Sequence, residues 1–242
     1  MEECMLFVSR ALFLVGCATL IGGCGATAAT EDVHPEGDAL VQAAPAAASV
    51  GARTFNGVAS ESSLYVLVYK DPETIAAGLS HDHVIRAEGW TGSFKWDPAE
   101  PQTCNVNIKV PVAKLVPDED HMRKKTGLDG LVKESDRDKI KNAMLGSDQL
   151  DGSKFPNISF NGTKCVPTAN GVKVSGMFKL RGKSRPLATV MKLDTNGKRL
   201  TATGTFKLKA TDFGFEPFSA GFGALKNQNE MKFSVRFVGD AK

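Results

Sequence analysis

The chain has few of the residues on which most enzymes and metal sites depend. Four histidines and five cysteines occur among its 242 residues. None of them has the Cys-x-x-Cys or His-x-x-x-His spacing with which short segments hold zinc. The Gly-x-Ser-x-Gly motif of serine hydrolases is absent as well. These absences argue against an enzyme, and we expect none.

Charge of one sign is also scarce. The chain carries 30 Lys and Arg against 27 Asp and Glu, a net charge of +3 at pH 7. Its longest basic cluster is RKK at residues 123–125, which is typical of a solvated surface. A nucleic-acid-binding protein usually gathers positive charge into a patch or stripe. We therefore expect no nucleic-acid partner.

No apolar run is long enough to cross a bilayer as a helix. The segment ALFLVGCATLIGGC, residues 11–24, has the length of a signal-peptide core. Its end, LIGGC, resembles the lipobox of bacterial lipoproteins, whose cysteine becomes the lipidated first residue of the mature chain. We expect residues 1–24 to be a lipoprotein-type signal peptide with Cys24 as the lipidation site. Cleavage without lipidation, which gives a soluble periplasmic protein, is the alternative.

Residues 25–52 contain no aromatic side chain and show no periodicity. Such a segment cannot bury enough apolar surface to offset its ordering entropy, so we expect a flexible tether. The folded domain then covers residues 53–242. A lipidated cysteine, a tether and a domain form the layout of a periplasmic protein anchored to a membrane. Gly25 after Cys24, rather than Asp, favours the outer membrane by resemblance to lipoprotein sorting signals.

Two cysteines remain in the domain once the leader is removed. Cys104 begins the segment CNVNIKVPV, and Cys165 lies near the end of NISFNGTKCV. If the two segments pair as antiparallel strands, the thiols can meet, and disulfides persist in an exported protein. Two free buried thiols are the alternative.

Alternation of apolar and polar residues dominates the domain. In NVNIKV, Val106, Ile108 and Val110 point to one side, and VKVSGMFKL, TFKLKA and MKFSVRFV repeat the pattern. Turn signals such as ANG and TNG separate such segments, so we expect an antiparallel sandwich or barrel. One helix is expected between VPVAKLVPD and FPNISF, with Ser135 as its N-cap and Gly146 as its stop. It should cross one end of the sheet.

The segment GLSHDHVIRAEGW, residues 78–90, places two histidines on one face of a strand. That face carries His81, His83, Ile85 and Ala87. The apolar residues that follow, Phe94 and Trp96, are even-numbered, so the inward parity changes along the strand. A β-bulge around Gly89 would insert one residue and reconcile the two halves.

Several longer segments resemble the YceI-like domain, a family of bacterial periplasmic proteins. They are GLSHDHVIRAEGWTGSFKWDP, VNIKVPVAKLVPD, DQLDGSKFPNISFNGTKC, VSGMFKLRGKSRPLATVMKL and MKFSVRFVG. The resemblance covers about residues 53–240 and implies an all-β fold, an extended antiparallel eight-stranded lipocalin-like barrel with a short helical insertion. It also implies a membrane-anchored periplasmic binding protein that sequesters or carries an isoprenoid, quinone or fatty-acyl chain. No chemistry on that chain and no other cofactor are expected.

Inward-facing residues are the candidates for lining a ligand tunnel inside such a barrel. The candidates are His81, His83, Ile85, Phe94, Trp96, Val106, Ile108, Phe160, Phe178, Phe206 and Phe233. Two interpretations of the histidines stay open. They hydrogen-bond the head group of a bound lipid, or they are satisfied by neighbouring protein groups and only hold the start of the strand.

Two other functions stay open as well. If its own side chains fill the barrel, the protein is a structural or stress-related barrel without a ligand. Alternatively, His81 and His83 hold a metal or haem, with His121, Asp82 and Asp120 as the nearby third ligands. We assign no metal site on the spacing alone. The sequence leaves the oligomeric state open, a homodimer included.

The segment TDFGFEPFSAGFGALKNQ, residues 211–228, sets phenylalanines among glycines. We expect its Phe213, Phe215, Phe218 and Phe222 to be exposed. Exposed phenylalanines lower solubility unless they pack over something, so the loop should fold over one end of the barrel as a lid or contact the membrane surface. A hairpin that caps the core is the alternative.

Overall fold

The computed structural model of the protein describes residues 51–242. The expected signal peptide, Cys24 and residues 25–50 of the expected tether lie outside this part of the chain. No helix within residues 51–242 is long and apolar enough to cross a membrane.

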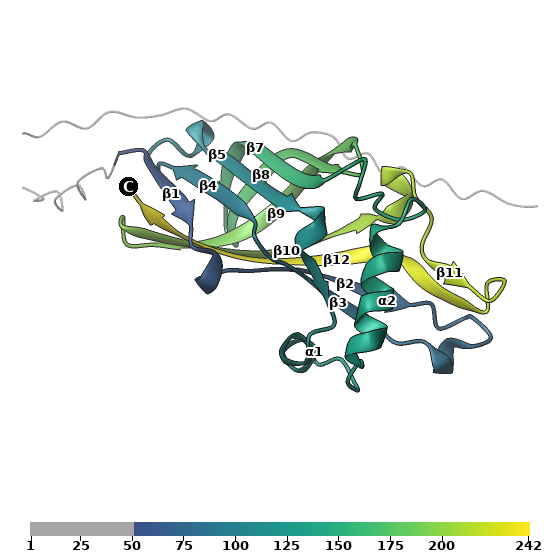
Figure 1. Ribbon diagram of the computed structural model, residues 1–242. Coiled ribbons are helices and arrows are strands. Elements are labelled where there is room, and N and C mark those ends of the chain that lie inside the picture. Colours follow the sequence, from purple (N-terminus) through teal and green to yellow (C-terminus); the bar gives the residue numbers. More distant parts are fainter. Residues whose placement is uncertain (1–50) are drawn as a thin grey trace, which may run out of the picture. The chain divides into compact units, whose positions relative to one another are not determined.

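Antiparallel strands make up most of residues 51–242, and two short helices interrupt them (Figure 1). The strands are β1 (Arg53–Gly57), β2 (Ser63–Lys70), β3 (His83–Ala87), β4 (Thr91–Trp96), β5 (Asn105–Pro111), β6 (Leu115–Pro117), β7 (Asn157–Thr168), β8 (Gly171–Leu180), β9 (Lys183–Thr195), β10 (Arg199–Lys209), β11 (Ser219–Ala220) and β12 (Leu225–Ala241). The helices α1 (Asp120–Thr126) and α2 (Glu134–Leu145) lie between β6 and β7.

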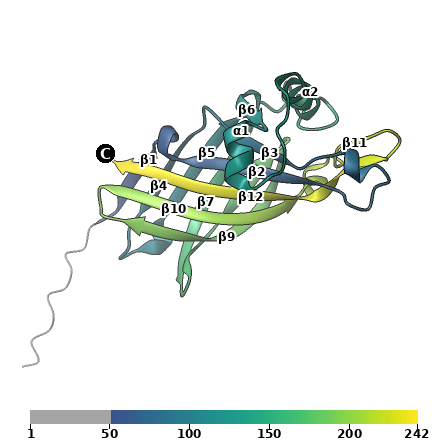
Figure 2. The same cartoon turned by 90° about the horizontal axis from the view of Figure 1, so that it is seen from below.

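Eight of the strands close into a barrel (Figure 2). The ring runs β1, β4, β5, β7, β8, β9, β10 and β12, and β12 pairs back onto β1 with Ala241 opposite Phe55. Neighbouring strands of the ring are antiparallel. The expected eight-stranded antiparallel barrel is therefore confirmed.

Three strands of the ring continue beyond a break. At one end of the barrel, β2, β3 and β6 extend β1, β4 and β5 and pair in the same order beside β12. The breaks are a 3-10 turn at Ala59–Glu61, a bend at residues 88–90 and a 3-10 turn at Val112–Lys114. The sheet is consequently longer on this side than the closed ring, and α1 and α2 pack against the extension.

The strand that carries the histidines is broken rather than bulged. The expected parity change is confirmed, since His83 in β3 and Phe94 in β4 both face the interior. The expected bulge at Gly89 is wrong, because residues 88–90 belong to no strand and Gly89 adopts a φ of 56°. The neighbouring strand, β5 with β6, breaks at the same level. The hydrogen-bond ladder is therefore interrupted in both strands, whereas a β-bulge inserts one residue into one strand only.

The structure has two helices where the sequence predicted one. α2 begins at Glu134 after Lys133, and no side chain caps it, so Ser135 is not the N-cap. The negative charge of Glu134 in the first turn favours this start. The predicted end at Gly146 is confirmed. The unpredicted α1, only 7 residues long, is too short to show a helical period, and it packs on β3 through Met122.

The end of the barrel at which β1 meets β12 is filled by its own side chains. The large buried side chains there are Phe55, Trp90, Trp96 and Leu200. The ring of Trp90 packs against that of Phe237, with centroids 6.0 Å apart. At this end Cys104, just before β5, and Cys165 of β7 form a disulfide with Cα atoms 5.9 Å apart. This half of the interior is a packed core.

Removing the disulfide should destabilise the barrel. We expect the Cys104→Ala/Cys165→Ala variant to lose about 4 kcal/mol of unfolding free energy, because the bridge restricts the unfolded chain over a separation of 61 residues. Urea unfolding followed by fluorescence of the buried tryptophans measures the loss. The reduced wild-type chain is the control and should unfold with the variant. If the oxidised wild type has the same midpoint as the variant, the bridge does not stabilise the fold.

Candidate functional site

A cavity of ≈ 290 Å³ occupies the other half of the barrel interior. Its wall is almost wholly apolar and comes from the inward faces of the strands and from α2. The volume reaches the lower end of the range of small-molecule sites, about 300 Å³.

Most of the predicted lining residues border this cavity. They are His83, Ile85, Phe94, Val106, Ile108, Phe160, Phe178, Phe206 and Phe233. The rings of Phe206 and Phe233 stack with centroids 4.9 Å apart, and Phe178 meets both of them edge-on. One side of the wall is thus an aromatic cluster. The period-two alternation of the strands brings these side chains inward.

Two predicted lining residues lie elsewhere. Trp96 is buried in the packed end, where its ring stands edge-on to Phe94 with centroids 6.1 Å apart. His81 is exposed, because β3 begins only at His83 and the strand alternation does not extend back to it. The prediction that Trp96 and His81 line the tunnel is wrong.

Sequence reasoning missed two parts of the wall. Val66 and Val68 of β2 border the cavity. Their segment SLYVLVYK is apolar at six successive positions, so it predicts a strand without indicating which face points inward. Ile140 and Met144 of α2 border it as well. Their i, i+4 spacing predicts one face of a helix, but nothing in it says which part of the barrel that face covers.

His83 is one of a few polar residues in the mostly apolar wall. Its Nδ1 lies 2.6 Å from Oδ2 of Asp118, whose side chain is fully buried. Since a carboxylate only accepts hydrogen bonds, we assign the proton to Nδ1. Within residues 51–242, no protein group is hydrogen-bonded to Nε2. Asp118 therefore holds the imidazole in one orientation and leaves its second nitrogen available.

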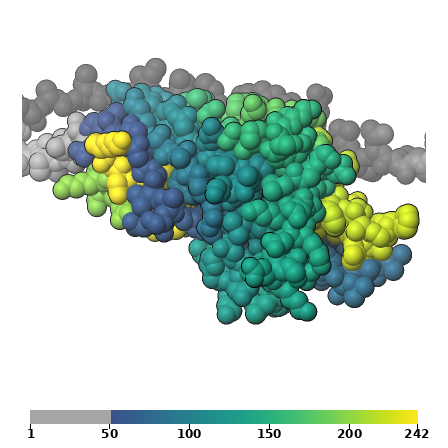
Figure 3. Space-filling view, in the orientation of Figure 1, coloured from purple at the N-terminus to yellow at the C-terminus, as the bar shows by residue number. Residues whose placement is uncertain are grey.

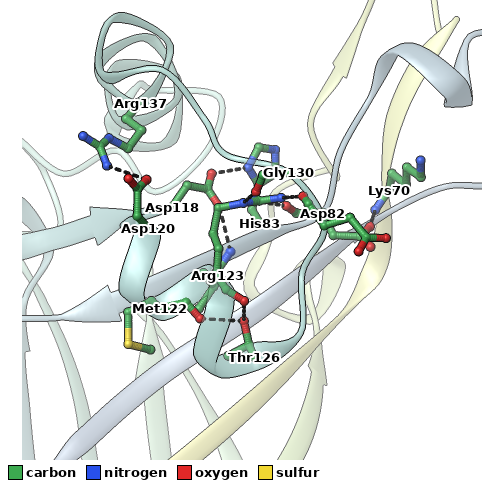
Figure 4. Close-up of polar contacts among 12 residues, drawn as sticks. Lys70, Asp82, His83, Asp118, Asp120, Met122, Arg123, Thr126, Gly130 and Arg137 are labelled. Atoms are coloured by element: carbon green, nitrogen blue, oxygen red, sulfur yellow. Dashed lines mark hydrogen bonds and ion pairs between the residues drawn. The ribbon is translucent and has the colours of Figure 1, made fainter.

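Asp118 and Arg123 form a buried ion pair behind His83 (Figure 4). Oδ1 of Asp118 accepts from Nη1 of Arg123 at 2.9 Å and from the amide of Val84 at 3.0 Å. The guanidinium also donates to the backbone carbonyls of Asp82, Asp129 and Gly130. Every nitrogen of the guanidinium and both oxygens of the carboxylate thus take part in hydrogen bonds, which offset the cost of burying the pair. The pair ties α1 and the loop after it to the start of β3.

The backbone of Asp118 makes this geometry possible. Its φ is 51°, in the left-handed region that few residues other than glycine adopt. Its amide donates to the carbonyl of Val84 at 2.8 Å, so the chain turns back under β3 directly after β6. No motif or spacing in the sequence marks Asp118, and it was not predicted.

The environment shifts the pKa values of two of these groups. Burial alone would raise the pKa of Asp118, but the hydrogen bond and charge of His83, the Val84 amide and Arg123 outweigh it and lower that pKa. Partial burial and the neighbouring His83 lower the pKa of His81, whose ring stands edge-on to that of His83 with centroids 4.8 Å apart. At neutral pH, Asp118 is a carboxylate and His81 is uncharged.

A metal ion is the other group that these residues could hold. His81, His83 and Asp118 hold one ligand atom each within 4.8 Å of one another. Asp118 is therefore the third group, in place of those that the sequence analysis named. Both of its oxygens already accept hydrogen bonds, and the Arg123 guanidinium beside it repels a cation. The geometry fits an oriented histidine better than a metal centre.

The segment at residues 211–228 divides into two parts. Phe213 and Phe215 are buried, so the prediction that they are exposed is wrong. Phe215 and Phe218 border the cavity, so this first part of the segment contributes to its wall. The second part is the hairpin of β11 and β12, and its tip carries Phe222 in full exposure. Packing against the cavity explains why the first part carries phenylalanines, but it does not explain the exposed Phe222 of the second part.

A closed barrel of eight strands around an apolar cavity is the architecture of proteins that enclose one small ligand. Residues 70–238 match the family model described as the YceI-like domain. The match spans more than half of the chain, and the protein belongs to the YceI-like domain family. The resemblance found in the sequence is thereby confirmed.

Individual relatives are distant. A UPF0312 protein of Shewanella baltica is 27% identical over 146 residues, which cover 57% of this chain and 67% of that protein. A UPF0312 protein of Pseudomonas syringae pv. syringae is 25% identical over 134 residues, covering 52% of this chain and 60% of that protein. The crystal structure of Burkholderia cenocepacia BcnA has a TM-score of 0.55 and 16% identity over 75% of this chain and 98% of that one. This likeness concerns the fold alone.

Replacing Asp118 by Asn should destabilise the protein by about 3–5 kcal/mol, because the Arg123 charge stays buried without its partner. Asn tolerates a left-handed backbone, so the change tests the charge rather than the turn. The matched control is Asp120→Asn, since Asp120 is exposed and lies 3.5 Å from Arg137. We expect the control to lose less than about 1 kcal/mol. Urea unfolding measures both variants, and equal losses would contradict a special role for Asp118.

The pH dependence of the same variant gives a second readout. The pKa of Asp118 is lower in the folded protein than in the unfolded chain. Its contribution to stability is thus fully present above the unfolded pKa of about 3.9 and is lost as the pH falls through the lower folded value. The gap in stability between wild type and Asp118→Asn should narrow below about pH 4. A gap that stays constant there counts against the ion pair.

Proposed function

We propose that the protein sequesters or carries one apolar chain of the isoprenoid, quinone or fatty-acyl kind in the barrel and performs no chemistry on it. The observation that carries the proposal is the apolar cavity of ≈ 290 Å³ in a barrel whose other end is packed. An empty cavity lowers stability, because the groups around it lose packing contacts. A barrel with a purely structural role would gain stability by filling it, so the cavity favours a binding function.

The position of His83 indicates how the bound apolar chain is oriented in the cavity. Along the sheet, His83 pairs with Val68, and Val68 pairs with Met231. The polar residues Asn227 and Gln228 border the cavity on the same side, whereas the opposite side ends on the packed core. We infer that the head group lies at His83 and the tail points toward the core.

The chemistry of His83 narrows the head group. With Nδ1 held by Asp118, Nε2 of His83 is left to hydrogen-bond a ligand. A hydroxyl or a carboxyl group can form that bond, whereas a bare hydrocarbon cannot. We therefore infer a ligand with one hydrogen-bonding group at the end of an apolar tail.

Location is part of the same proposal. We propose export to the periplasm and retention by a lipid on Cys24, with the outer membrane favoured by the residue that follows. The disulfide between Cys104 and Cys165 supports an oxidising compartment. An anchor would keep the carrier close to the membrane from which apolar chains come.

Metal or haem binding is the second candidate function. The grouping of His81, His83 and Asp118 within 4.8 Å favours it. To bind a cation, however, Asp118 would have to give up hydrogen bonds to Arg123 or His83, and the charge of Arg123 would remain nearby. Lipid binding uses the same residues without breaking a contact.

Native mass spectrometry of protein purified without refolding tests the proposal. We expect a bound lipid on the wild type and a several-fold smaller bound fraction on Ala87→Phe, because the ring occupies space in the cavity that Ala87 borders. Ala188→Phe is the matched control, since Ala188 lies exposed on the outside of β9, and it should keep the ligand. A wild-type barrel that is empty and takes up neither labelled isoprenoid nor labelled fatty acid would refute the binding function.

The role of His83 has its own test. His83→Ala should weaken binding of decanol about fivefold and leave binding of decane unchanged, because one hydrogen bond contributes about 1 kcal/mol. Displacement of a fluorescent fatty-acid probe measures both. His121→Ala, at an exposed position of α1, is the control and should change neither. Equal losses for decanol and decane would assign His83 a packing role only.

Unchanged metal content in His81→Ala/His83→Ala would rule out metal binding by these two histidines.

A further inference from the structure

Two loops lie together at one end of the barrel domain (Figure 3). Both carry large apolar side chains that are exposed to solvent. One loop joins β2 to β3, and the other is the turn of the β11–β12 hairpin. The exposed fractions of Ile75, Leu79 and Phe222 are 100%, 83% and 113%. Single exposed apolar residues are ordinary, whereas a group of them marks an interaction site.

Hydrogen bonds hold the two loops side by side. The amide of Ala76 donates to the carbonyl of Ala224 at 3.0 Å, and nearer the barrel the amide of Asp71 donates to that of Lys226 at 2.8 Å. The exposed residues therefore belong to one surface. We call residues 74–79 together with 217–225 the apolar tip.

The apolar tip carries no charge. Its two parts read TIAAGL and PFSAGFGAL, in a chain of which 24% is charged. Charged residues resume on both sides, with Asp71 and Glu73 on one loop and Glu216 and Lys226 on the other. These flanking charges include more acids than bases, so the tip is apolar without being basic.

The apolar tip adjoins the cavity. Pro217 and Phe218, which begin its second part, border the cavity together with Asn227 and Gln228, which follow it. An apolar chain that enters or leaves on the side of His83 thus passes the tip.

We propose that the apolar tip inserts into the interfacial layer of a lipid bilayer and places the end of the cavity against the membrane. Three features select a bilayer as the occupant: the side chains project outward from loop ends, no charge interrupts them, and they adjoin the apolar cavity. A fluid apolar layer accepts such a surface without a complementary groove. Because the flanking charges are not basic, insertion depends on apolar burial rather than on attraction to anionic lipid. Membrane insertion does not depend on the proposed function. Only its purpose, the transfer of an apolar ligand between membrane and cavity, rests on that function.

A fluorescent probe on the tip tests the insertion in the full chain. The background carries Cys4→Ser, Cys17→Ser and Cys24→Ser, so a probe that reacts with thiols labels only Phe222→Cys or, as the control, Val190→Cys on the outside of β9. With vesicles of phosphatidylcholine, an environment-sensitive probe at Phe222→Cys should brighten several-fold and shift to the blue, while the control should not change. The probe reports its own surroundings, so the result is independent of how the rest of the chain attaches. High salt and added phosphatidylglycerol should leave the signal unchanged.

Three results would overturn the proposal. One is an unchanged spectrum at Phe222→Cys, or an equal change at Val190→Cys. Another is a shift that develops with protein concentration in the absence of vesicles, which would identify a second copy of the chain as the occupant. The third is a signal that requires phosphatidylglycerol and is lost in high salt.

The rate at which the protein takes up a fatty acid from vesicles gives a functional readout. Ile75→Asp/Phe222→Asp should take up labelled fatty acid from vesicles at least tenfold more slowly than the wild type and from aqueous solution at the same rate. Val166→Asp/Val190→Asp, at exposed apolar positions elsewhere on the barrel, should match the wild type. If the two double variants are equally slow, the tip has no role in transfer. A wild type that binds neither fatty acid nor isoprenoid from either source would refute the proposed function and leave the probe measurement of insertion standing.

Discussion

The pairing of β12 along both of its edges is the constraint on which the rest of the barrel depends. This strand of 17 residues pairs with β10 on one edge and with β1 and then β2 on the other. It thereby closes the ring at the packed end and carries the extension of the sheet at the hollow end. Once the register is fixed, alternate side chains of each strand must face the interior, because a shift by one residue would turn every one of them outward. The content of the interior is a consequence of this closure.

The two ends of the barrel are stabilised in different ways. The packed end combines aromatic side chains with the disulfide between Cys104 and Cys165. The hollow end lacks part of that packing, and each missing contact lowers stability. There the buried pair of Asp118 and Arg123 ties α1 to β3, and the same carboxylate orients His83. Asp118 thus both stabilises the fold and orients the candidate binding group His83, so a change at Asp118 affects the fold and the site together.

Sequence reasoning succeeded where a local pattern is sufficient. The alternation in NVNIKV and MKFSVRFV predicts which side chains face inward, and those residues border the cavity or the core. It failed for Trp96 because alternation says which face a residue takes but not how far along the barrel axis it lies. The position of His81 was wrong because the strand starts two residues later. Asp118 could not be predicted, since its contact with His83 spans 35 residues and depends on a left-handed turn. Phe222 was predicted to be exposed, but nothing in the sequence joined it to Ile75 and Leu79.

The sequence by itself determined the all-β class, the inward faces of the strands, the end of the helical insertion at Gly146 and the membership of a family. The first three follow from patterns within single segments, because strand periodicity and helix-stop signals are local properties of the chain. The family membership follows from several such segments taken together. Only the tertiary structure decided that half of the interior is hollow, that Asp118 orients His83 and that two distant loops form one uncharged tip. The physical reason is that cavity volume, buried ion pairs and shared surfaces depend on distances between segments, and closure of the sheet sets those distances.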